Sequence, residues 1–227
     1  MNFIPYGKQT ISEDDINSVV EVLKSDFLTT GPKVKEFEES IAKYCGSKYC
    51  VAVSNGTAAL HLASLVLLEQ NDKVLTTPNS FLATSNSILY VGAKPIFADI
   101  QENGNIDLDL CEKELKKDSS IKAIYVVHFS GNPVDQTKLK YLKETYNIKI
   151  LEDCAHSIGA ISEGIKAGSC VNSDISIFSF HPVKHITTGE GGAITTNSKE
   201  AYEKLLLLRG HGMSPHLDIA PWQYDMT

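Results

Sequence analysis

One lysine of this sequence, Lys184, lies in a segment rich in groups that can contact a ligand. The surrounding run, residues 179–192, reads Ser-Phe-His-Pro-Val-Lys-His-Ile-Thr-Thr-Gly-Glu-Gly-Gly and joins two predicted strands. Its glycines allow a ligand to approach the backbone closely, its hydroxyls can donate hydrogen bonds, and a lysine amine is a nucleophile toward carbonyl carbons. A solvated surface lysine is the alternative interpretation for any single Lys. The composition of the whole run favours a ligand site.

A second motif, residues 54–58 (Ser-Asn-Gly-Thr-Ala), leads from a predicted strand into a predicted helix. The free N–H groups and the dipole at a helix N-terminus form an anion site, and small residues let a phosphate approach. A simple N-cap at Ser54 or Asn55 explains the motif equally well. Neither a nucleotide P-loop nor a GxGxxG fingerprint is present in the sequence.

An acidic pair, Glu152 and Asp153, stands at the end of a third predicted strand. One of these carboxylates could pair with a cationic ring or a metal. A cap on the following turn is the alternative, and for an isolated acidic pair it is the favoured one.

Composition and charge exclude several classes of protein. The 227 residues are 42% hydrophobic and 22% charged, which is ordinary for a globular protein, and the formal net charge of −7 comes without a basic run. A nucleic-acid-binding or membrane-surface protein is therefore not expected, and neither a membrane-spanning apolar run nor a secretory signal is present. The cysteines are odd in number and scattered, and His181 and His185 lack the spacing of metal ligands. We predict a cytoplasmic protein with reduced thiols and no metal site.

The chemistry-bearing segments are separated by short apolar runs that alternate with helical periodicity. This rhythm is typical of βαβ units and a mostly parallel sheet, in which ligands bind beyond the carboxyl ends of the strands. No repeat or linker divides the chain, and the sequence after Arg209 reads as a loop without a final element. The predicted strands are 49–53, 73–77, 95–99, 121–127, 149–151, 175–178 and 193–196, and the predicted helices are 12–23, 33–44, 57–68, 80–90, 108–115, 136–146 and 198–209.

These motifs together resemble a known family. The lysine run, with Glu-Asp-Cys-Ala-His at 152–156 and Ser-Asn-Gly-Thr-Ala-Ala-Leu at 54–60, is similar to the DegT/StrS family of pyridoxal-phosphate-dependent nucleotide-sugar aminotransferases. Arg-Gly-His-Gly-Met at 209–213 resembles the family's run downstream of that lysine. Within the family, the chain most resembles the members that aminate a UDP-linked 4-keto-6-deoxy-N-acetyl sugar in pseudaminic acid synthesis. The resemblance implies the α/β large domain of a fold-type-I pyridoxal-phosphate-dependent transferase, with a mixed, mainly parallel sheet flanked by helices.

The resemblance also implies roles for the residues singled out above. Lys184 aligns with the lysine that holds the cofactor as a Schiff base and acts as general acid and base. Asp153 aligns with the carboxylate that keeps the pyridine nitrogen protonated, which makes the cofactor a better electron sink. Phe81 matches the aromatic ring that stacks on the cofactor, although a core Phe at a helix start is the alternative, and His156 matches a polar residue near the cofactor's hydroxyl. The remaining matches are Gly56, Thr57, Ala58 and Ser179 for the phosphate, and Tyr6, Asp26, Phe27, Leu28 and Thr29, again with Gly56 and Ser179, for the sugar nucleotide.

The activity implied is transfer of an amino group from an amino acid, which we expect to be glutamate, to the keto carbon of a nucleotide-linked 4-keto-6-deoxy sugar, in a homodimer. Residues 1–227 are expected to be the N-terminal large cofactor-binding domain, with the chain stopping before the family's small C-terminal domain. Two alternatives stay open. A pyridoxal-phosphate-dependent sugar dehydratase of the same fold would carry His in place of Lys184. A non-catalytic module would keep the sheet without the reaction.

Overall fold

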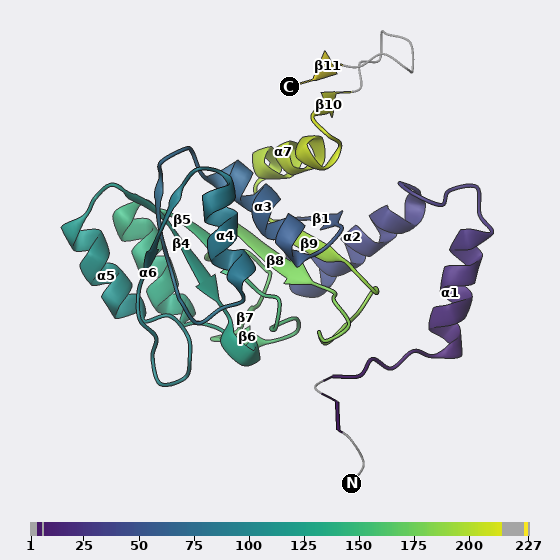
Figure 1. Cartoon of the computed structure of the whole chain (residues 1–227), viewed down its shortest axis with the longest axis horizontal. Helices are drawn as coiled ribbons and strands as arrows, with labels where there is room; N and C mark the ends of the chain where they lie inside the picture. The colour runs from purple at the N-terminus through teal and green to yellow at the C-terminus, as the bar shows by residue number, and fades with distance from the viewer. Residues whose placement is uncertain (1–3, 6, 215–224, 227) are drawn as a thin grey trace.

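The computed structural model describes residues 4–5, 7–214 and 225–226, and its centre is a seven-stranded sheet (Figure 1). The strands are β1 (Tyr49–Val53), β2 (Lys73–Thr76), β3 (Lys94–Phe97), β4 (Ile121–Val127), β5 (Lys149–Asp153), β8 (Ile175–Ser179) and β9 (Gly192–Thr196). Their order in space is β1-β9-β8-β5-β4-β2-β3. All neighbours from β3 to β8 pair in parallel, whereas β9 runs antiparallel to both β8 and β1. The predicted mixed, mainly parallel sheet is confirmed.

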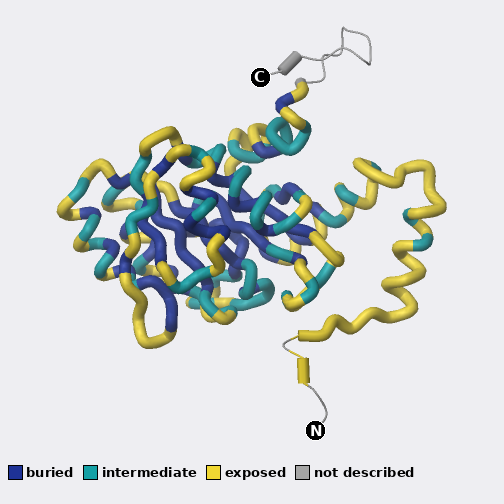
Figure 2. Tube along the Cα trace, viewed as in Figure 1, coloured by how far each residue is buried: buried dark blue, intermediate teal, exposed yellow. Residues whose placement is uncertain are grey.

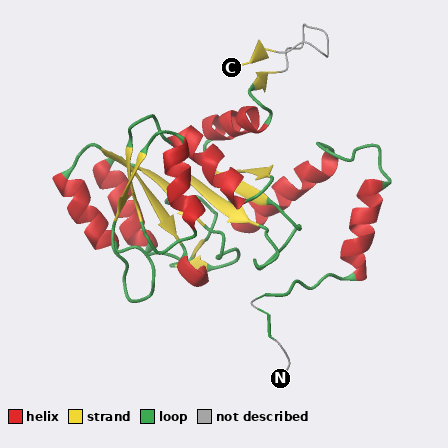
Figure 3. Ribbon diagram, in the orientation of Figure 1, coloured by secondary structure: helices red, strands yellow, loops and turns green. Residues whose placement is uncertain are grey.

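Helices cover both faces of this sheet (Figure 3). The covering helices are α2 (Pro32–Cys45), α3 (Gly56–Leu67), α4 (Leu82–Tyr90), α5 (Leu108–Lys117), α6 (Gln136–Tyr146) and α7 (Lys199–Arg209). A first helix, α1 (Glu13–Leu23), precedes them, and a short 3-10 turn, η1 (Phe129–Gly131), follows β4. Successive side chains of a strand point to opposite faces, so β4 sends Tyr125 toward α3 and α4 and its neighbours Ile124 and Val126 toward α5 and α6. The layers of an α/β domain follow from this alternation.

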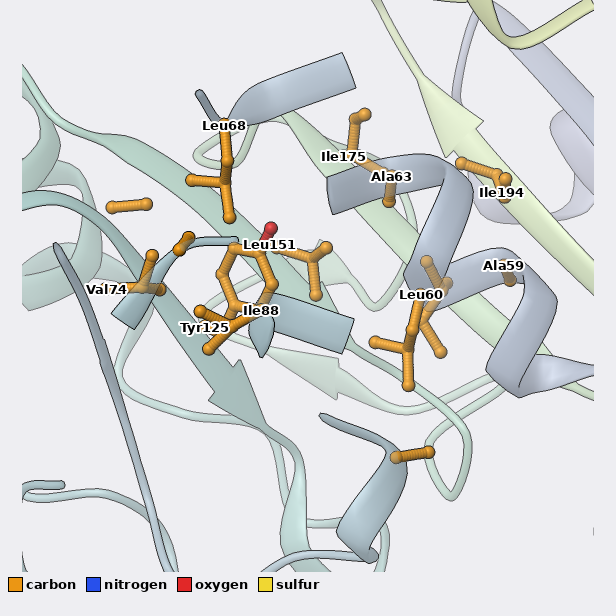
Figure 4. Close-up of a cluster of buried hydrophobic side chains, with 14 of the residues drawn as sticks. Ala59, Leu60, Ala63, Leu68, Val74, Ile88, Tyr125, Leu151, Ile175 and Ile194 are labelled. Carbon is orange, nitrogen blue, oxygen red and sulfur yellow. The ribbon is translucent and has the colours of Figure 1, made fainter. Parts of the chain in front are cut away.

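The core between the sheet, α3 and α4 is built from fully buried aliphatic side chains around Tyr125 (Figure 4). Its hydroxyl donates to Ser64 Oγ on α3 at 3.0 Å, which satisfies the one polar atom that this ring buries. Each fully buried Leu or Ile contributes about 1.5–3 kcal/mol through removal from water. This packing fixes the N-termini of α3 and α4, and both ends lie beside the site described below.

The first helix lies apart from these layers (Figures 1 and 2). Ser12 and Asp15 form a capping box at the predicted start of this helix, yet none of its residues is buried. Its apolar residues Ile16, Val19 and Leu23 are exposed. An amphipathic helix with an uncovered apolar face needs a partner surface, and the described part of this chain does not supply one.

Two short pairs of strands lie outside the main sheet. A hairpin of β6 (Ile161–Ser162) and β7 (Ile165–Lys166) follows β5, and β10 (Met213–Ser214) pairs with β11 (Asp225–Met226), so the expectation of loop alone after Arg209 was wrong. All cysteines are free and buried. Across residues 4–5, 7–214 and 225–226, no helix is long and apolar enough to cross a membrane.

Candidate active site

A cavity of about 610 Å³ opens where the parallel strands β4, β5 and β8 end. The N-terminal turns of α3 and α4 and the loop between β8 and β9 complete its walls. Several residues that are far apart in the sequence, all of them predicted to contact the cofactor, line it together: Gly56, Thr57, Phe81, Asp153, His156, Ser179 and Lys184.

Lys184 stands in the loop that joins β8 to the antiparallel β9. The loop is closed at its base, where Phe180 N–H donates to the Gly191 carbonyl at 2.8 Å, and Lys184 N–H donates to the His181 carbonyl at 2.9 Å. Burial lowers the pKa of Lys184, partly opposed by the charge of Asp153. More of this amine is therefore in the neutral, nucleophilic form at a given pH than in an exposed lysine.

His156 contacts that amine directly, with Nε2 at 2.6 Å from Lys184 Nζ. Burial lowers the pKa of His156, and the positive charge of Lys184 lowers it further. The imidazole is therefore neutral beside a protonated Lys184. In that state it accepts a hydrogen bond from the ammonium group and holds it toward the cavity.

Asp153 ends β5 with its carboxylate on the cavity wall. Thr84 Oγ1 donates to Oδ2 at 2.8 Å, and Ala155 N–H donates to Oδ1 at 3.1 Å. The cap predicted as the alternative is confirmed, because this side chain bonds the turn that follows the strand. Asp153 also lines the cavity, and its pairing with a cationic ring stays a prediction. Only 5% of Asp153 is exposed, so solvent screens its charge weakly.

Glu152 points to the opposite face of the sheet, away from the cavity. Its carboxylate accepts hydrogen bonds from Gln136 at 2.8 Å, Ser173 at 2.5 Å and Ser176 at 3.1 Å, and its Oε1 lies 3.2 Å from His128 Nε2. Burial raises the pKa of Glu152, but these partners, His128 first, outweigh burial and hold the pKa at about 2. Of the acidic pair, Asp153 therefore lines the cavity, whereas Glu152 belongs to a buried hydrogen-bond network on the other face of the sheet.

The N-terminus of α3 forms the opposite wall. Asn55 caps it, with Oδ1 accepting the N–H of Ala58 at 2.8 Å, so the predicted N-cap is confirmed and Ala58 N–H is already bonded. Gly56 and Thr57 occupy the first helical positions, whose N–H groups have no acceptor within a helix. A Cβ on Gly56 would stand 2.9 Å from Ser179 Cβ, so glycine is what lets this helix end approach β8.

Phe81 precedes α4 and is 76% exposed, which excludes the alternative of a core phenylalanine. The loop before it is held by Asn79, whose Nδ2 donates to the Gly104 carbonyl at 2.9 Å. An exposed ring on a braced loop at a cavity wall suits stacking on a flat ligand.

The predicted sugar-nucleotide residues divide between two places. Gly56 and Ser179 line the cavity, whereas residues 26–29, Asp26, Phe27, Leu28 and Thr29, lie exposed in the connection between α1 and α2 and do not line it. Tyr6 lies outside the described residues. Contact of these N-terminal residues with a sugar nucleotide stays a prediction.

Sequence reasoning missed some residues of the site. His181, Val183 and Glu190 line the cavity from within the lysine run, where composition alone did not separate them from their neighbours. Thr84 carried no signal, since a threonine inside a helix is common and its partner lies 69 residues away. Among the described residues, no cluster of three or more His, Cys, Asp or Glu could hold a metal ion.

Comparison with known proteins identifies the family of this chain. The model of the DegT/DnrJ/EryC1/StrS aminotransferase family matches residues 9–224, nearly the whole chain. The chain belongs to this family. The resemblance found in the sequence motifs is thereby confirmed, and Lys184 and Asp153 lie in one cavity of a DegT/DnrJ/EryC1/StrS fold.

Several of the proteins that this chain resembles are named as sugar aminotransferases or transaminases. The UDP-4-amino-4,6-dideoxy-N-acetyl-beta-L-altrosamine transaminase of Campylobacter jejuni serotype O:23/36 is 46% identical over 92% of this chain and 56% of its own length. The Helicobacter pylori aminotransferase PseC, described as involved in the biosynthesis of pseudoaminic acid, superposes with a TM-score of 0.89 at 33% identity over 98% of this chain and 59% of its own. A sugar aminotransferase of Streptococcus pneumoniae in its PLP form gives 0.88 at 31% identity over 98% and 60%. The chain therefore spans somewhat more than half the length of these relatives.

Proposed function

We propose that this chain is the large, cofactor-binding domain, residues 1–227, of a cytoplasmic pyridoxal-phosphate-dependent nucleotide-sugar aminotransferase. The enzyme transfers an amino group from an amino acid, glutamate in our proposal, to the keto carbon of a UDP-linked 4-keto-6-deoxy-N-acetyl sugar. One observation carries the proposal: a lysine amine and a buried carboxylate, Lys184 and Asp153, line the same cavity as the N-terminus of α3. The names of the relatives support the class of substrate.

The residues present fit pyridoxal phosphate. The first-turn N–H groups of Gly56 and Thr57, with the Ser179 hydroxyl, would hold the phosphate, because a helix N-terminus stabilises an anion. Phe81 would stack on one face of the ring, and Asp153 would pair with its nitrogen. When bound, pyridoxal phosphate supplies an aldehyde carbon that exchanges amino groups and a ring that accepts electrons from the carbon losing its proton.

Lys184 performs the proton transfers in this proposal. Its amine lines the cavity, and burial lowers its pKa, which favours the neutral form that would accept a proton from the donor's Cα and return it elsewhere. His156, with Nε2 2.6 Å from that amine, would orient the amine and contact the cofactor's hydroxyl. Asp153 is held by its two hydrogen bonds and would thereby keep a fixed negative charge for the ring nitrogen.

The homodimer belongs to the same proposal. The exposed apolar residues of α1, Ile16, Val19 and Leu23, form a surface of the kind that a second copy of the chain covers. Residues 26–29, which follow α1 directly, would then be ordered by the same contact. We propose that Asp26, Phe27, Leu28 and Thr29, with Tyr6, contact the sugar nucleotide in that assembly.

The lysine at position 184 disfavours the dehydratase alternative, which would carry a histidine there. The lysine and the carboxylate that line one cavity disfavour a non-catalytic module. The test is to incubate the protein with pyridoxal phosphate, glutamate and a UDP-4-keto-6-deoxy-N-acetyl sugar and to analyse the sugar by mass spectrometry. We expect an amino sugar and one 2-oxoglutarate per amino sugar formed, both absent in Lys184→Arg and retained in the surface control Lys199→Arg. A deoxygenated keto sugar formed with release of ammonia, and with no amino sugar, would support the dehydratase instead.

A further inference from the structure

We propose that Thr84 is a positioning residue for the cofactor site, acting through Asp153. Its hydroxyl fixes the carboxylate in place and keeps the shared proton on the cofactor's ring nitrogen rather than on Asp153. The inference rests on the proposed function, since it concerns what Asp153 does toward pyridoxal phosphate.

The contact is short, buried and specific to one oxygen. Thr84 Oγ1 donates to Asp153 Oδ2 at 2.8 Å, and the other oxygen, Oδ1, accepts Ala155 N–H at 3.1 Å. Thr84 is fully buried. With a donor on each oxygen, rotation of the carboxylate about its last bond breaks at least one hydrogen bond, so the group has one favoured orientation.

The neighbouring hydroxyls of α4 show that this contact is not ordinary helix chemistry. Ser85 Oγ donates to the Leu82 carbonyl at 3.2 Å and Ser87 Oγ to the Thr84 carbonyl at 2.8 Å, so both bond within their own helix, as such side chains commonly do. The Thr84 hydroxyl instead crosses to the end of β5. Its direction is set by the site and not by the helix.

The same helical turn also carries the ring proposed to stack on the cofactor. Thr84 N–H donates to the Phe81 carbonyl at 3.1 Å, and Phe81 lines the cavity together with Asp153. Thr84 therefore links the proposed stacking ring to the proposed partner of the ring nitrogen. A displacement of α4 would move both contacts at once.

The electrostatic effect follows from the direction of the hydrogen bond. An ionised carboxylate only accepts, so the Thr84 hydroxyl must donate to it, and a donor favours the charged form of a carboxylate. When one proton is shared between a carboxylate and a ring nitrogen, a donor on the carboxylate makes it the weaker base and leaves the proton on the nitrogen. Removal of the hydroxyl therefore moves the proton toward Asp153.

The test uses pyridoxal phosphate labelled with 15N in the ring. Wild type and the variants Thr84→Val, Thr84→Ala, Thr84→Ser and Ser87→Ala are loaded with it, and the 15N chemical shift is recorded at neutral pH. A borohydride-reduced portion of each sample is mapped to confirm attachment at Lys184. Circular dichroism melts report on the fold, and Ser87→Ala is the matched control because it removes a buried hydroxyl of α4 that does not touch Asp153.

We expect the 15N resonance of Thr84→Val and Thr84→Ala to move toward that of unprotonated pyridine, while Thr84→Ser and Ser87→Ala keep the wild-type position. Attachment at Lys184 with an unchanged resonance in both donor-free variants overturns this inference and leaves the proposed function standing. Absence of attachment at Lys184 in the wild-type chain overturns the proposed function and this inference together.

Discussion

Substitution of Glu152 by Gln tests the buried network that lies behind the site. The carboxylate of Glu152 accepts three hydrogen bonds, from Gln136, Ser173 and Ser176, and lies beside His128. Gln has one acceptor oxygen and one donor amide in the place of two acceptor oxygens, so at least one of these groups faces a donor instead of an acceptor. We expect Glu152→Gln to fold and to be markedly less stable than wild type.

The magnitude follows from proton linkage. The pKa of Glu152 falls from 4.5 to about 2 in the folded chain, and each pKa unit corresponds to about 1.4 kcal/mol, so the ionised side chain contributes about 3 kcal/mol. Because the folded pKa is the lower one, this contribution is complete above the unfolded value and is lost as the pH falls toward 2. About 1 kcal/mol of it is gone at pH ~4 and about 2 kcal/mol at pH ~3.

The assay is urea unfolding of wild type and Glu152→Gln, followed by far-UV circular dichroism across this pH range. We expect the difference in unfolding free energy to be about 3 kcal/mol at neutral pH and to shrink as the pH falls. Glu203→Gln, which removes an exposed carboxylate 3.5 Å from Lys199, should stay within about 0.5 kcal/mol of wild type. A Glu152→Gln difference below about 1 kcal/mol, or one independent of pH, would refute the reasoning.

Three further predictions concern the site and its assembly. Asp153→Asn should still attach pyridoxal phosphate at Lys184 but release the Cα proton of glutamate about a hundredfold more slowly, as measured by deuterium exchange; a near wild-type rate would reduce Asp153 to a cap. Attachment at Lys184, followed by absorbance, should accelerate with pH through a midpoint below the ordinary lysine value of 10.5, because burial lowers the pKa of that amine; a midpoint at or above 10.5 contradicts this. Light scattering should give a dimer for wild type and a monomer for the double variant Val19→Asp, Leu23→Asp, because two charges would be placed in the proposed apolar interface. If the double variant is still a dimer, the interface does not include α1.

Local sequence pattern was enough to locate most elements of the fold. The strand predicted at residues 121–127 is β4, and Ser12 opens the first helix as a cap, because run length and capping chemistry depend on neighbouring residues only. The antiparallel direction of β9 could not be predicted, since it depends on how residues 180–191 fold back. The exposure of α1 was equally hidden, because an apolar stripe does not specify which surface covers it.

The site was predictable where its residues cluster in the sequence. Lys184 stood out through the composition of its run and Asp153 through its place at a strand end, and both line the cavity. The alternation of side chains along β5 separates Asp153, which lines the cavity, from Glu152, which faces the other side of the sheet; the acidic pair in the sequence did not by itself show which carboxylate lines the site. Thr84 became visible only in three dimensions, because its role rests on one contact between α4 and β5.

The most direct test of the central claim is to identify the lysine that takes up the cofactor. The chain is incubated with pyridoxal phosphate, reduced with borohydride, digested and mapped by mass spectrometry. The cavity predicts a single modified residue, Lys184, because this amine lies in the cavity with a pKa lowered by burial. Modification of another lysine in its place, or equal modification of exposed lysines such as Lys199, would contradict the account.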